Sequence, residues 1–255
     1  MSHGPQVALV TGASRGIGAQ IAQRLAADGY AVAVNYSSDR AGAEQVVQNI
    51  VAAGGTACAL RADLARPDEV LALFNAVDAQ LGPLAVLVNN GGMTGGFARV
   101  EEIEAELLTQ VFAVNVIGAF ICCREAVRRM SSRHGGHGGV IVNISSRAGE
   151  LGGAGEWVHY AASKGALDTL TKGLAKEVAL EGIRVNAIAP GLIETQLHAA
   201  AGEPGRTARM AASVPLGRAG LPQEIAQCVA WLVSPAASYV TGHVLAVDGG
   251  LSTSL

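Results

Sequence analysis

The sequence has few charged residues and few aromatic ones, and it lacks any cluster of basic side chains. Of its 255 residues, 15% are charged and 4% are aromatic, and the formal net charge is -3. No stripe of lysine and arginine indicates a surface for nucleic acid, and none supports a role at a membrane surface. We therefore expect neither nucleic acid nor a membrane among its partners.

The sequence also offers no long hydrophobic run and no secretion signal. We find no apolar run that approaches the roughly 20 residues needed to cross a bilayer. The N-terminus, MSHGPQ, has no basic segment followed by an apolar one, so we expect no signal peptide. The cysteines lack CxxC spacing, which predicts reduced thiols: Cys58, Cys122, Cys123 and Cys228. These features favour a cytoplasmic protein.

Segments typical of strands alternate with helical segments along the whole chain, and no linker or short repeat divides them. The expected strands are residues 6–10, 30–35, 57–60, 84–88, 140–144, 183–189 and 243–247. The clearest helices are expected at 41–53, 101–129, 160–181 and 222–233. This pattern predicts an α/β protein with a single Rossmann domain over residues 1–255: a doubly wound, seven-stranded parallel sheet with helices on both faces.

A glycine-rich turn, TGASRGIG at Thr11–Gly18, follows the first expected strand and precedes a helix. Gly12 allows the turn, Gly16 allows the backbone to approach a diphosphate, and Gly18 allows the helix to lie close to the strand. The spacing differs from the common G-x-G-x-x-G fingerprint. A plain strand-to-helix turn is therefore an alternative to a dinucleotide site.

The end of the second strand lacks the acidic residue with which many NAD-binding folds hold the adenosine ribose. Asn35, Tyr36, Ser37 and Ser38 stand there instead, and they would not repel a 2′-phosphate. Arg15 could supply a cation for that phosphate, although it could equally be a solvated loop residue. The sequence thus predicts NADP(H) as the preferred cofactor, with NAD(H) possible.

Two further strand ends carry candidate cofactor residues. Asp63 follows the third strand, where it would meet an adenine, and a helix N-cap is its alternative role. The small residues in Asn89-Asn90-Gly91-Gly92 follow the fourth strand and leave room for a cofactor.

Asn115 is a polar residue in the middle of an apolar helical segment. A buried amide must find hydrogen-bond partners, so Asn115 is either a satisfied core residue or part of a site.

Two histidines, His134 and His137, lie among glycines with no neighbouring carboxylate. We interpret this tract as a surface connection and expect no metal site.

A tyrosine and a lysine, Tyr160 and Lys164, lie four residues apart and share one face of a helix. A lysine cation would favour the phenolate, so the pair could exchange a proton near neutral pH. An ordinary amphipathic helix is the alternative for an isolated YxxxK. Ser145 and Ser146 end the fifth strand, and successive side chains alternate faces, so only one of them can face a ligand.

The segment from Leu192 to Ala219 is rich in alanine, glycine and charged residues and is weakly periodic. It predicts a mobile substrate lid at about 192–219, with a tolerant surface loop as the alternative. We expect this lid and the loop that contains Glu150, Glu156, Trp157 and His159 to shape a substrate pocket.

Taken together, TGxxxGxG, NNxG, a mid-helix asparagine, a strand-end serine and YxxxK resemble the short-chain dehydrogenase/reductase family over nearly the whole chain. The resemblance is closest to 3-oxoacyl-acyl-carrier-protein reductases and sugar dehydrogenases. It implies that Tyr160 is the catalytic acid or base and that Lys164 lowers its pKa and holds the nicotinamide ribose. It also implies that Ser146 binds the substrate carbonyl and that Asn115 anchors a water near Lys164. The implied cofactor contacts are Gly12, Ser14, Arg15, Gly16, Ile17, Gly18, Asn35, Tyr36, Ser37, Asp63, Leu64, Asn89, Gly91, Tyr160, Lys164, Pro190, Gly191, Ile193 and Thr195.

The chain departs from the family pattern at two places. The usual NNAG reads Asn89-Asn90-Gly91-Gly92, and Ser146 precedes Tyr160 by one residue more than is usual. Counting back the usual distance reaches Arg147, whose permanent charge does not suit a hydroxyl's task. We expect the glycines of residues 152–155 to absorb the extra residue, because glycine tolerates unusual backbone angles.

The expected function is reversible hydride transfer between NADP(H) and a carbonyl or secondary alcohol. A catalytically idle nucleotide sensor or scaffold on the same fold is one alternative. A methyltransferase-like Rossmann domain is another, which the YxxxK motif disfavours. The high apolar fraction, and the likeness of residues 101–129, 160–181 and 243–247 to the family's subunit contacts, predict a homotetramer.

Overall fold

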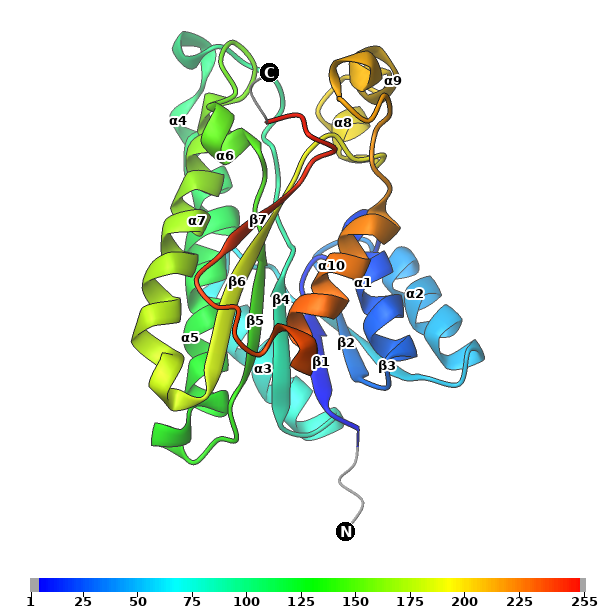
Figure 1. Cartoon of the computed structure of the whole chain (residues 1–255), viewed down its shortest axis with the longest axis vertical. Coiled ribbons are helices and arrows are strands. Elements are labelled where there is room, and N and C mark those ends of the chain that lie inside the picture. Colours follow the sequence, from blue (N-terminus) through cyan, green and yellow to red (C-terminus); the bar gives the residue numbers. More distant parts are fainter. Residues whose placement is uncertain (1–4, 253–255) are drawn as a thin grey trace.

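A computed structural model describes residues 5–252, apart from the side chains at positions 198 and 200. It contains one seven-stranded sheet, all parallel, in the order β3-β2-β1-β4-β5-β6-β7 (Figure 1). The strands are β1 (Val7–Val10), β2 (Ala31–Tyr36), β3 (Thr56–Arg61), β4 (Leu84–Asn89), β5 (Gly139–Ile144), β6 (Ile183–Pro190) and β7 (Val244–Val247). The predicted seven-stranded parallel sheet is confirmed.

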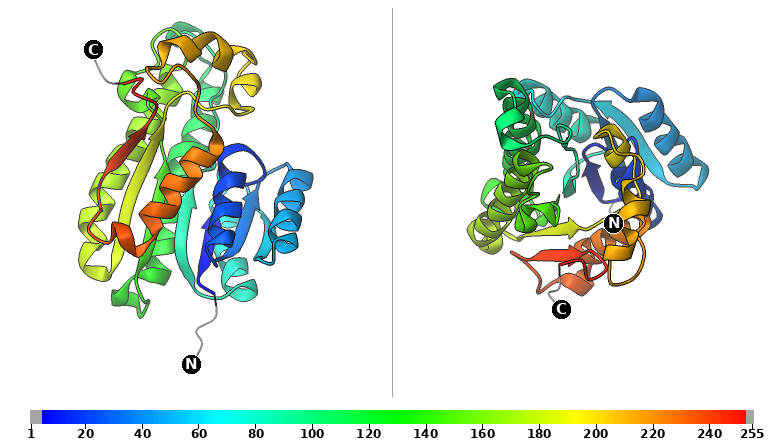
Figure 2. Two further views of the ribbon diagram at one scale, coloured as in Figure 1. Left: turned by 45° about the vertical axis from the view of Figure 1, so that its right-hand side comes forward. Right: turned by 90° about the horizontal axis from the view of Figure 1, so that it is seen from above.

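Helices cover both faces of the sheet, as Figures 1 and 2 show. One layer consists of α1 (Gly16–Ala27), α2 (Arg40–Ala52) and α10 (Pro222–Val233). The other consists of α3 (Pro67–Gln80), α5 (Ala119–Met130) and α7 (Val158–Val178). The shorter helical segments are η1 (Val100–Glu102), α4 (Ala105–Phe112), η3 (Ser132–His134), α6 (Ala148–Leu151), η4 (Ala179–Glu181), α8 (Leu197–Ala200), α9 (Arg206–Met210), η5 (Ala211–Ser213) and η6 (Pro235–Ala237).

Alternating side chains of β1 explain why its sequence is apolar throughout. Ala8 and Val10 belong to the core under α1, α2 and α10, whereas Val7 and Leu9 belong to the core under α3, α5 and α7. All four are at most 1% exposed. A strand that is covered on both faces needs an apolar residue at every position, so the usual alternation of polar and apolar residues is lost.

The centre of the sheet is also the place where the chain changes direction. β1 pairs with β2 on one side and with β4 on the other, so the connections on its two sides diverge. In open α/β sheets this switch point leaves a crevice at the carboxyl ends of the strands. The glycine turn after β1 and the Asn89-Asn90 segment after β4 meet here, and Asn90 Nδ2 donates to the Gly12 carbonyl at 2.9 Å. The expected ligand edge thus lies between β1 and β4.

The long helix expected at 101–129 is not a continuous α-helix. α4 begins at Ala105, and a π-helical segment, Ala113–Gly118, separates it from α5. A π-helical turn holds more residues than an α-turn and often lies at functional sites. Asn115 lies inside this segment and is 2% exposed.

The sequence has no unbroken apolar run of about 20 residues, but one helical stretch is long and apolar enough to cross a membrane by length and composition. The helical stretch Ala105–Met130 has 26 residues and meets both criteria. Here it forms one layer of the fold, because Val111, Cys122 and Ala126 are buried in it. Only 33% of its most apolar part is buried, and Ile117 and Phe120 are about half exposed at 52% and 49%. Its outer face is therefore an apolar surface.

The four cysteines have free thiols. Burial raises the pKa of Cys122 and Cys123, so both stay protonated and inert. Between residues 5 and 252 no group of three or more His, Cys, Asp and Glu side chains is arranged to hold a metal ion.

The segment expected to form a lid contains α8, α9 and η5, which lie beyond the carboxyl ends of the strands at the top of Figure 1. An isolated parallel bridge between Ile193 and Gly220 closes its base. Its place over the strand ends fits a lid, and its mobility stays a prediction.

Candidate active site

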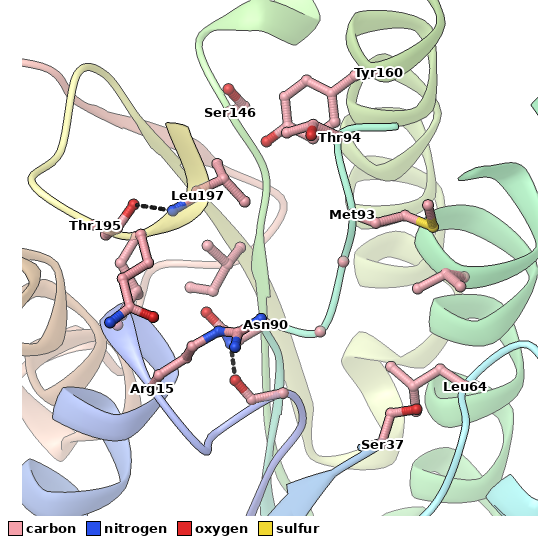
Figure 3. A pocket seen from close by; sticks show the side chains of 18 of the residues that line it. Arg15, Ser37, Leu64, Asn90, Met93, Thr94, Ser146, Tyr160, Thr195 and Leu197 are labelled. Carbon is pink, nitrogen blue, oxygen red and sulfur yellow. Dashed lines mark hydrogen bonds between the residues drawn. The ribbon is translucent and has the colours of Figure 1, made fainter. Parts of the chain in front are cut away.

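A cavity of about 730 Å³ lies at the carboxyl edge of the sheet. Figure 3 shows Ser146 and Tyr160 at one end of it and Arg15, Ser37 and Leu64 toward the other. Its lining includes most of the residues predicted from the sequence: Gly12, Ser14, Arg15, Gly16, Ile17, Asn35, Tyr36, Ser37, Asp63, Leu64, Gly91, Ser146, Tyr160, Lys164, Pro190, Gly191, Ile193 and Thr195. This volume is in the range of a site for a drug-sized ligand.

Two of the predicted cofactor contacts, Gly18 and Asn89, lie behind the lining. A Cβ at Gly18 would lie 2.4 Å from Asn90 Nδ2, so this glycine allows α1 to approach the neighbouring loop. Asn89 is 4% exposed, and its Nδ2 donates to Asn143 Oδ1 at 2.9 Å. The side chain of Asn89 thus faces the core between β4 and β5, and a cofactor contact of Asn89 stays a prediction.

Asn35 lines the cavity, but its amide is occupied by the protein. Its Oδ1 accepts from the Gly12 N–H at 3.2 Å, and its Nδ2 lies within bonding distance of the Leu60 and Ala62 carbonyls. Asn35 is 1% exposed. It therefore ties the glycine turn to the end of β3, and we assign it a positioning role.

The glycine turn has the backbone shape needed for a diphosphate. Gly12 and Gly16 have φ angles of +59° and +57°, which disfavour any other residue. A Cβ at Gly12 would lie 2.7 Å from Gly91 Cα. α1 has no acidic residue in its first turn and no side-chain cap at Arg15, so its first N–H groups can bind an anion. These features fit a dinucleotide.

The end of the cavity near Arg15 contains a carboxylate, Asp39, that the sequence motifs do not mark. Asp39 lines the cavity and lies 3.8 Å from Arg15 Nη1. Asp39 also caps α2, because its Oδ1 accepts from the Gly42 N–H at 3.0 Å. The Asp-x-x-Gly spacing before a helix is the signal that could have found it. Arg15 is 62% exposed at its side chain and can reach a ligand.

Asp63 does not cap a helix, because the N-cap of α3 is Arg66. Its Oδ1 accepts from the Ala65 N–H at 2.9 Å within a turn, and the residue lines the cavity. Of its two expected roles, the helix cap is therefore wrong.

Tyr160, Lys164 and Ser146 come together at the end of the cavity opposite Arg15. Lys164 Nζ lies 5.6 Å from the centre of the Tyr160 ring and donates to the Ile144 carbonyl at 2.7 Å. Ser146 hydrogen-bonds Tyr160. Tyr160 and Lys164 are 7% and 5% exposed, so both polar groups are nearly out of contact with water.

Ser145 also borders the cavity, but its hydroxyl is engaged by the backbone of α7. It is 3% exposed, and its Oγ donates to the Lys164 carbonyl at 3.3 Å. The extra residue between Ser146 and Tyr160 falls in a segment where Gly152, Gly153 and Gly155 all have positive φ angles. The geometry thus agrees with Ser146 as the serine that faces a ligand.

Burial shifts the pKa values of the tyrosine and the lysine in opposite directions. The pKa of Tyr160 is raised to about 12, because burial outweighs the hydrogen bond from Ser146, which lowers it. The pKa of Lys164 is lowered to about 8 by burial, against the attraction of Asp168. The expectation that Lys164, together with a bound oxidised nicotinamide, brings the Tyr160 pKa toward neutrality stays a prediction.

Asn115 connects the π-helical segment to the active-site helix. Its Oδ1 accepts from the Met93 N–H at 2.9 Å, and its Nδ2 donates to the Met93 carbonyl at 2.8 Å and to Ser163 Oγ at 3.0 Å. The amide is thus a satisfied core group that also supports the site, so both readings of Asn115 from the sequence describe it. The structure describes the protein partners of this amide, and a water near Lys164 stays a prediction.

Several other residues complete the cavity, and the sequence motifs do not mark them. Met93 and Thr94 line it next to Tyr160, and His159 Nε2 bonds the Thr94 carbonyl at 2.8 Å. Trp157 lies with its ring centre 5.4 Å from that of Tyr160. Trp157 and His159 were expected to shape a substrate pocket, and Trp157 lines the cavity.

Known proteins resemble this chain over nearly its full length. The uncharacterized oxidoreductase YgfF of Escherichia coli (strain K12) is 51% identical over 244 residues, which cover 96% of this chain and 99% of that protein. Residues 12–252 match the family model described as enoyl-(acyl carrier protein) reductase. The chain belongs to the short-chain dehydrogenase/reductase family. It is an oxidoreductase of that family, and the fold described above is the one its members share.

Two further comparisons bear on substrate and cofactor. The 3-oxoacyl-[acyl-carrier-protein] reductase FabG of Staphylococcus aureus (strain Mu50) is 42% identical over 246 residues, covering 96% of this chain and 97% of that protein. The crystal structure of a blue fluorescent protein from a metagenomic library in complex with NADPH has a TM-score of 0.89 and 37% identity. It covers 98% of this short-chain dehydrogenase/reductase and 99% of that chain.

The lowered pKa of Lys164 predicts a pH dependence of stability. The unfolded chain binds more protons than the folded chain between pH 8 and 10.5, the ordinary pKa of a lysine. Lys164 therefore lowers the free energy of unfolding at neutral pH. This free energy rises by about 3 kcal/mol as the pH increases across this window. Urea unfolding measures the free energy of unfolding of wild type and Lys164→Met at pH 7 and pH 10.5. The difference between the two proteins should change by about this amount between the two pH values.

Lys176→Met is the matched control, because Lys176 is an exposed lysine of the same helix. A difference between wild type and Lys164→Met that stays constant over this pH range would show that Lys164 is not desolvated.

Proposed function

We propose that this enzyme transfers hydride between NADP(H) and a carbonyl or secondary alcohol. The observation that carries the proposal is the grouping of Ser146, Tyr160 and Lys164 at one end of a cavity whose other end has a diphosphate-shaped glycine turn. The names of the relatives, oxidoreductase and reductase, support it. They also argue against an idle sensor or scaffold.

The chain's own groups supply proton transfer and orientation. The bound nicotinamide supplies or accepts the hydride at the substrate carbon. We assign Tyr160 the transfer of a proton to the substrate oxygen, and Ser146 a hydrogen bond to the same oxygen. Lys164 would hold the nicotinamide ribose, and Asn115 would hold α7 and the Met93 segment in register.

The pKa values favour the reductive direction near neutral pH. A Tyr160 phenol with a pKa of about 12 keeps its proton and can donate it to a carbonyl oxygen. The reverse reaction needs the phenolate, which a cationic oxidised nicotinamide would stabilise. We therefore propose that carbonyl reduction is the faster direction at pH 7, and alcohol oxidation gains at alkaline pH.

The preference for NADP(H) rests on Arg15, Tyr36 and Ser37, with Asp39 as the opposing charge. Arg15 lies beside the end of β2, where a 2′-phosphate would bind, and its exposed guanidinium can turn toward that group. The structural neighbour solved with NADPH supports the same choice. Asp39 repels a phosphate but is held by its bond to α2, so we propose a preference for NADP(H) with NAD(H) still accepted.

We further propose one domain over residues 1–255, with 192–219 as a substrate lid, in a cytoplasmic homotetramer. The exposed apolar face of α4 and α5 supports one subunit contact. The edge strand β7 supports a second, because an unpaired strand edge invites association.

Removing the proposed proton donor tests the catalytic assignment. Tyr160→Phe should lower kcat by far more than tenfold, a loss well above ~1.4 kcal/mol, because only the transferable proton is removed. Its affinity for NADPH should change by less than about twofold. Steady-state kinetics with a carbonyl panel and fluorescence titration with NADPH measure the two effects.

Ser146→Ala and Ser145→Ala form a matched pair for the same assignment. Ser146→Ala should lower kcat by roughly 10²-fold through loss of one bond to the developing oxyanion, while Ser145→Ala should stay within several-fold. A larger loss at Ser145, or a Tyr160→Phe enzyme that keeps more than about a tenth of wild-type kcat, would refute the assignment.

Kinetics with both cofactors test the proposed preference. We expect kcat/KM for NADPH to exceed that for NADH by about tenfold, and Arg15→Ala to remove most of that difference by weakening NADPH alone. Asp39→Asn keeps the cap of α2 and should increase the preference. Equal constants for the two cofactors in wild type would contradict the proposal.

Light scattering tests the tetramer. Wild type should have four times the 25.8 kDa mass of the chain. Phe120→Glu should dissociate it, because a charge would be buried in the contact, while Leu71→Glu on the exposed face of α3 should leave the mass unchanged. A monomeric wild type at micromolar concentration argues against the proposed assembly.

A further inference from the structure

The charged side chains of the cavity are unevenly distributed. Among the lining residues that the structure describes, they are Arg15, Asp39, Asp63 and Lys164. The first three belong to the loops after β1, β2 and β3, and Lys164 belongs to the proposed proton-transfer group. At the Tyr160 end of the cavity the lining is otherwise uncharged: Figure 3 shows Thr94 beside Tyr160, and Trp157 has its ring centre 5.4 Å from that of Tyr160.

The ionic groups closest to this end are already paired. Arg206 is 5% exposed, and its Nη1 donates to Glu156 Oε1 at 2.9 Å and to Glu203 Oε2 at 3.0 Å. Arg147 Nη1 lies 2.8 Å from Glu150 Oε2, and Arg147 Nε lies 3.2 Å from Asp248 Oδ2. Lys164 donates to the Ile144 carbonyl and is assigned to the nicotinamide ribose. A substrate carboxylate or phosphate entering here would therefore lose its water and meet cations that already have partners, which is unfavourable.

Trp157 forms an apolar wall at the same end. It is 8% exposed, and its ring stacks on Phe97 with centres 4.8 Å apart and planes at 23°. The ring centre of Tyr160 lies 5.4 Å away, and Trp157 borders the cavity. A flat apolar group attached to the reacting carbonyl would therefore meet a preformed aromatic surface.

Arg206 holds this wall from the side of the lid. Its guanidinium carbon lies 4.9 Å from the centre of the Trp157 ring and 5.0 Å from that of Phe97. It is at the start of α9, and it pairs with Glu156, the residue before Trp157. The Ala98 N–H also donates to the Glu156 carbonyl at 2.7 Å. Residues 97–98, 156–157 and 206 thus form one connected unit.

We propose that the substrate is an uncharged carbonyl compound with a flat apolar group that lies against Trp157, and that Arg206 is the positioning residue for Trp157. This rests on the proposed function and names the substrate class for the same site. Arg206 acts through the wall and does not bind an anionic substrate itself, because two carboxylates already neutralise it.

Three probes separate charge from shape. Ethyl benzoylformate and benzoylformate differ by one negative charge, and ethyl pyruvate replaces the phenyl group by a methyl group. With NADPH we expect kcat/KM for ethyl benzoylformate to exceed that for benzoylformate by about tenfold or more. An enzyme that prefers the carboxylate overturns the proposal.

Trp157 variants test the wall. Trp157→Ala should lower kcat/KM for ethyl benzoylformate by about tenfold, mainly through KM, and change that for ethyl pyruvate by less than about threefold. Trp157→Phe should retain most of the activity toward both esters, which separates loss of the wall from loss of folding. Equal losses for both esters in Trp157→Ala overturn the assignment of the wall.

Arg206 variants test the positioning role. Arg206→Met should raise KM for ethyl benzoylformate about fivefold with kcat for ethyl pyruvate unchanged, and Arg206→Lys should restore part of the loss. Arg209→Met is the matched control, because Arg209 pairs with the same Glu203 and is 60% exposed at its side chain. A uniform fall in kcat for every substrate would mean that Arg206 only stabilises the fold.

A binding measurement distinguishes failure of this inference from failure of the proposed function. The chain has two tryptophans, so Trp157 is the only one in a Trp231→Phe background. Ethyl benzoylformate should change its fluorescence in the presence of NADP+, and benzoylformate at the same concentration should not. A response to the ester without turnover would support the substrate class and refute the oxidoreductase proposal. A response to the acid alone would refute the substrate class.

Discussion

The need to pair buried amide groups ties segments around the sheet to its strands and helices. Asn35, Asn89, Asn115, Asn143 and Asn186 are all at most 4% exposed. Asn35 binds the glycine turn, Asn115 binds the Met93 backbone, and Asn186 binds the Val240 carbonyl and the His243 N–H. An unpaired buried amide is costly, so Asn35, Asn115 and Asn186 each fix the segment that supplies their partners. Two segments that line the cavity, the glycine turn and the Met93 segment, are held in this way.

Much of the fold follows from the sequence, because strands covered on both faces must be apolar and α/β units alternate. The predicted strands match β1 to β7 within one or two residues, and α10 matches its predicted bounds at Pro222 and Val233. The π-helical segment around Asn115 was missed, since its residues have the same apolar pattern as an α-helix. The helical stretch that contains this segment has the mean hydropathy of a membrane span although Thr109, Gln110 and Asn115 interrupt its apolar residues.

The site was predictable where a motif fixes backbone shape and less so where side-chain packing decides. Gly12 and Gly16 have the positive φ angles that the glycine turn requires. Asn89 and Asn90 are adjacent in sequence, but only Asn90 lines the cavity, because alternation along β4 turns Asn89 inward. The direction of the Tyr160 pKa shift depends on burial, which no local pattern reports. Asp39 was overlooked because its distance to Arg15 is set by the tertiary fold.

The contact between Arg206, Trp157 and Phe97 has a consequence for how this enzyme could acquire new specificity. The three residues come from separate segments of the chain, and Arg206 also pairs with Glu156, 50 positions away in the sequence. Surface positions usually accept substitutions one at a time. Here a substitution at one position leaves a charge or a ring at another without its partner. Laboratory evolution of the carbonyl preference should therefore succeed through paired substitutions at 156 and 206, in libraries that vary both codons together.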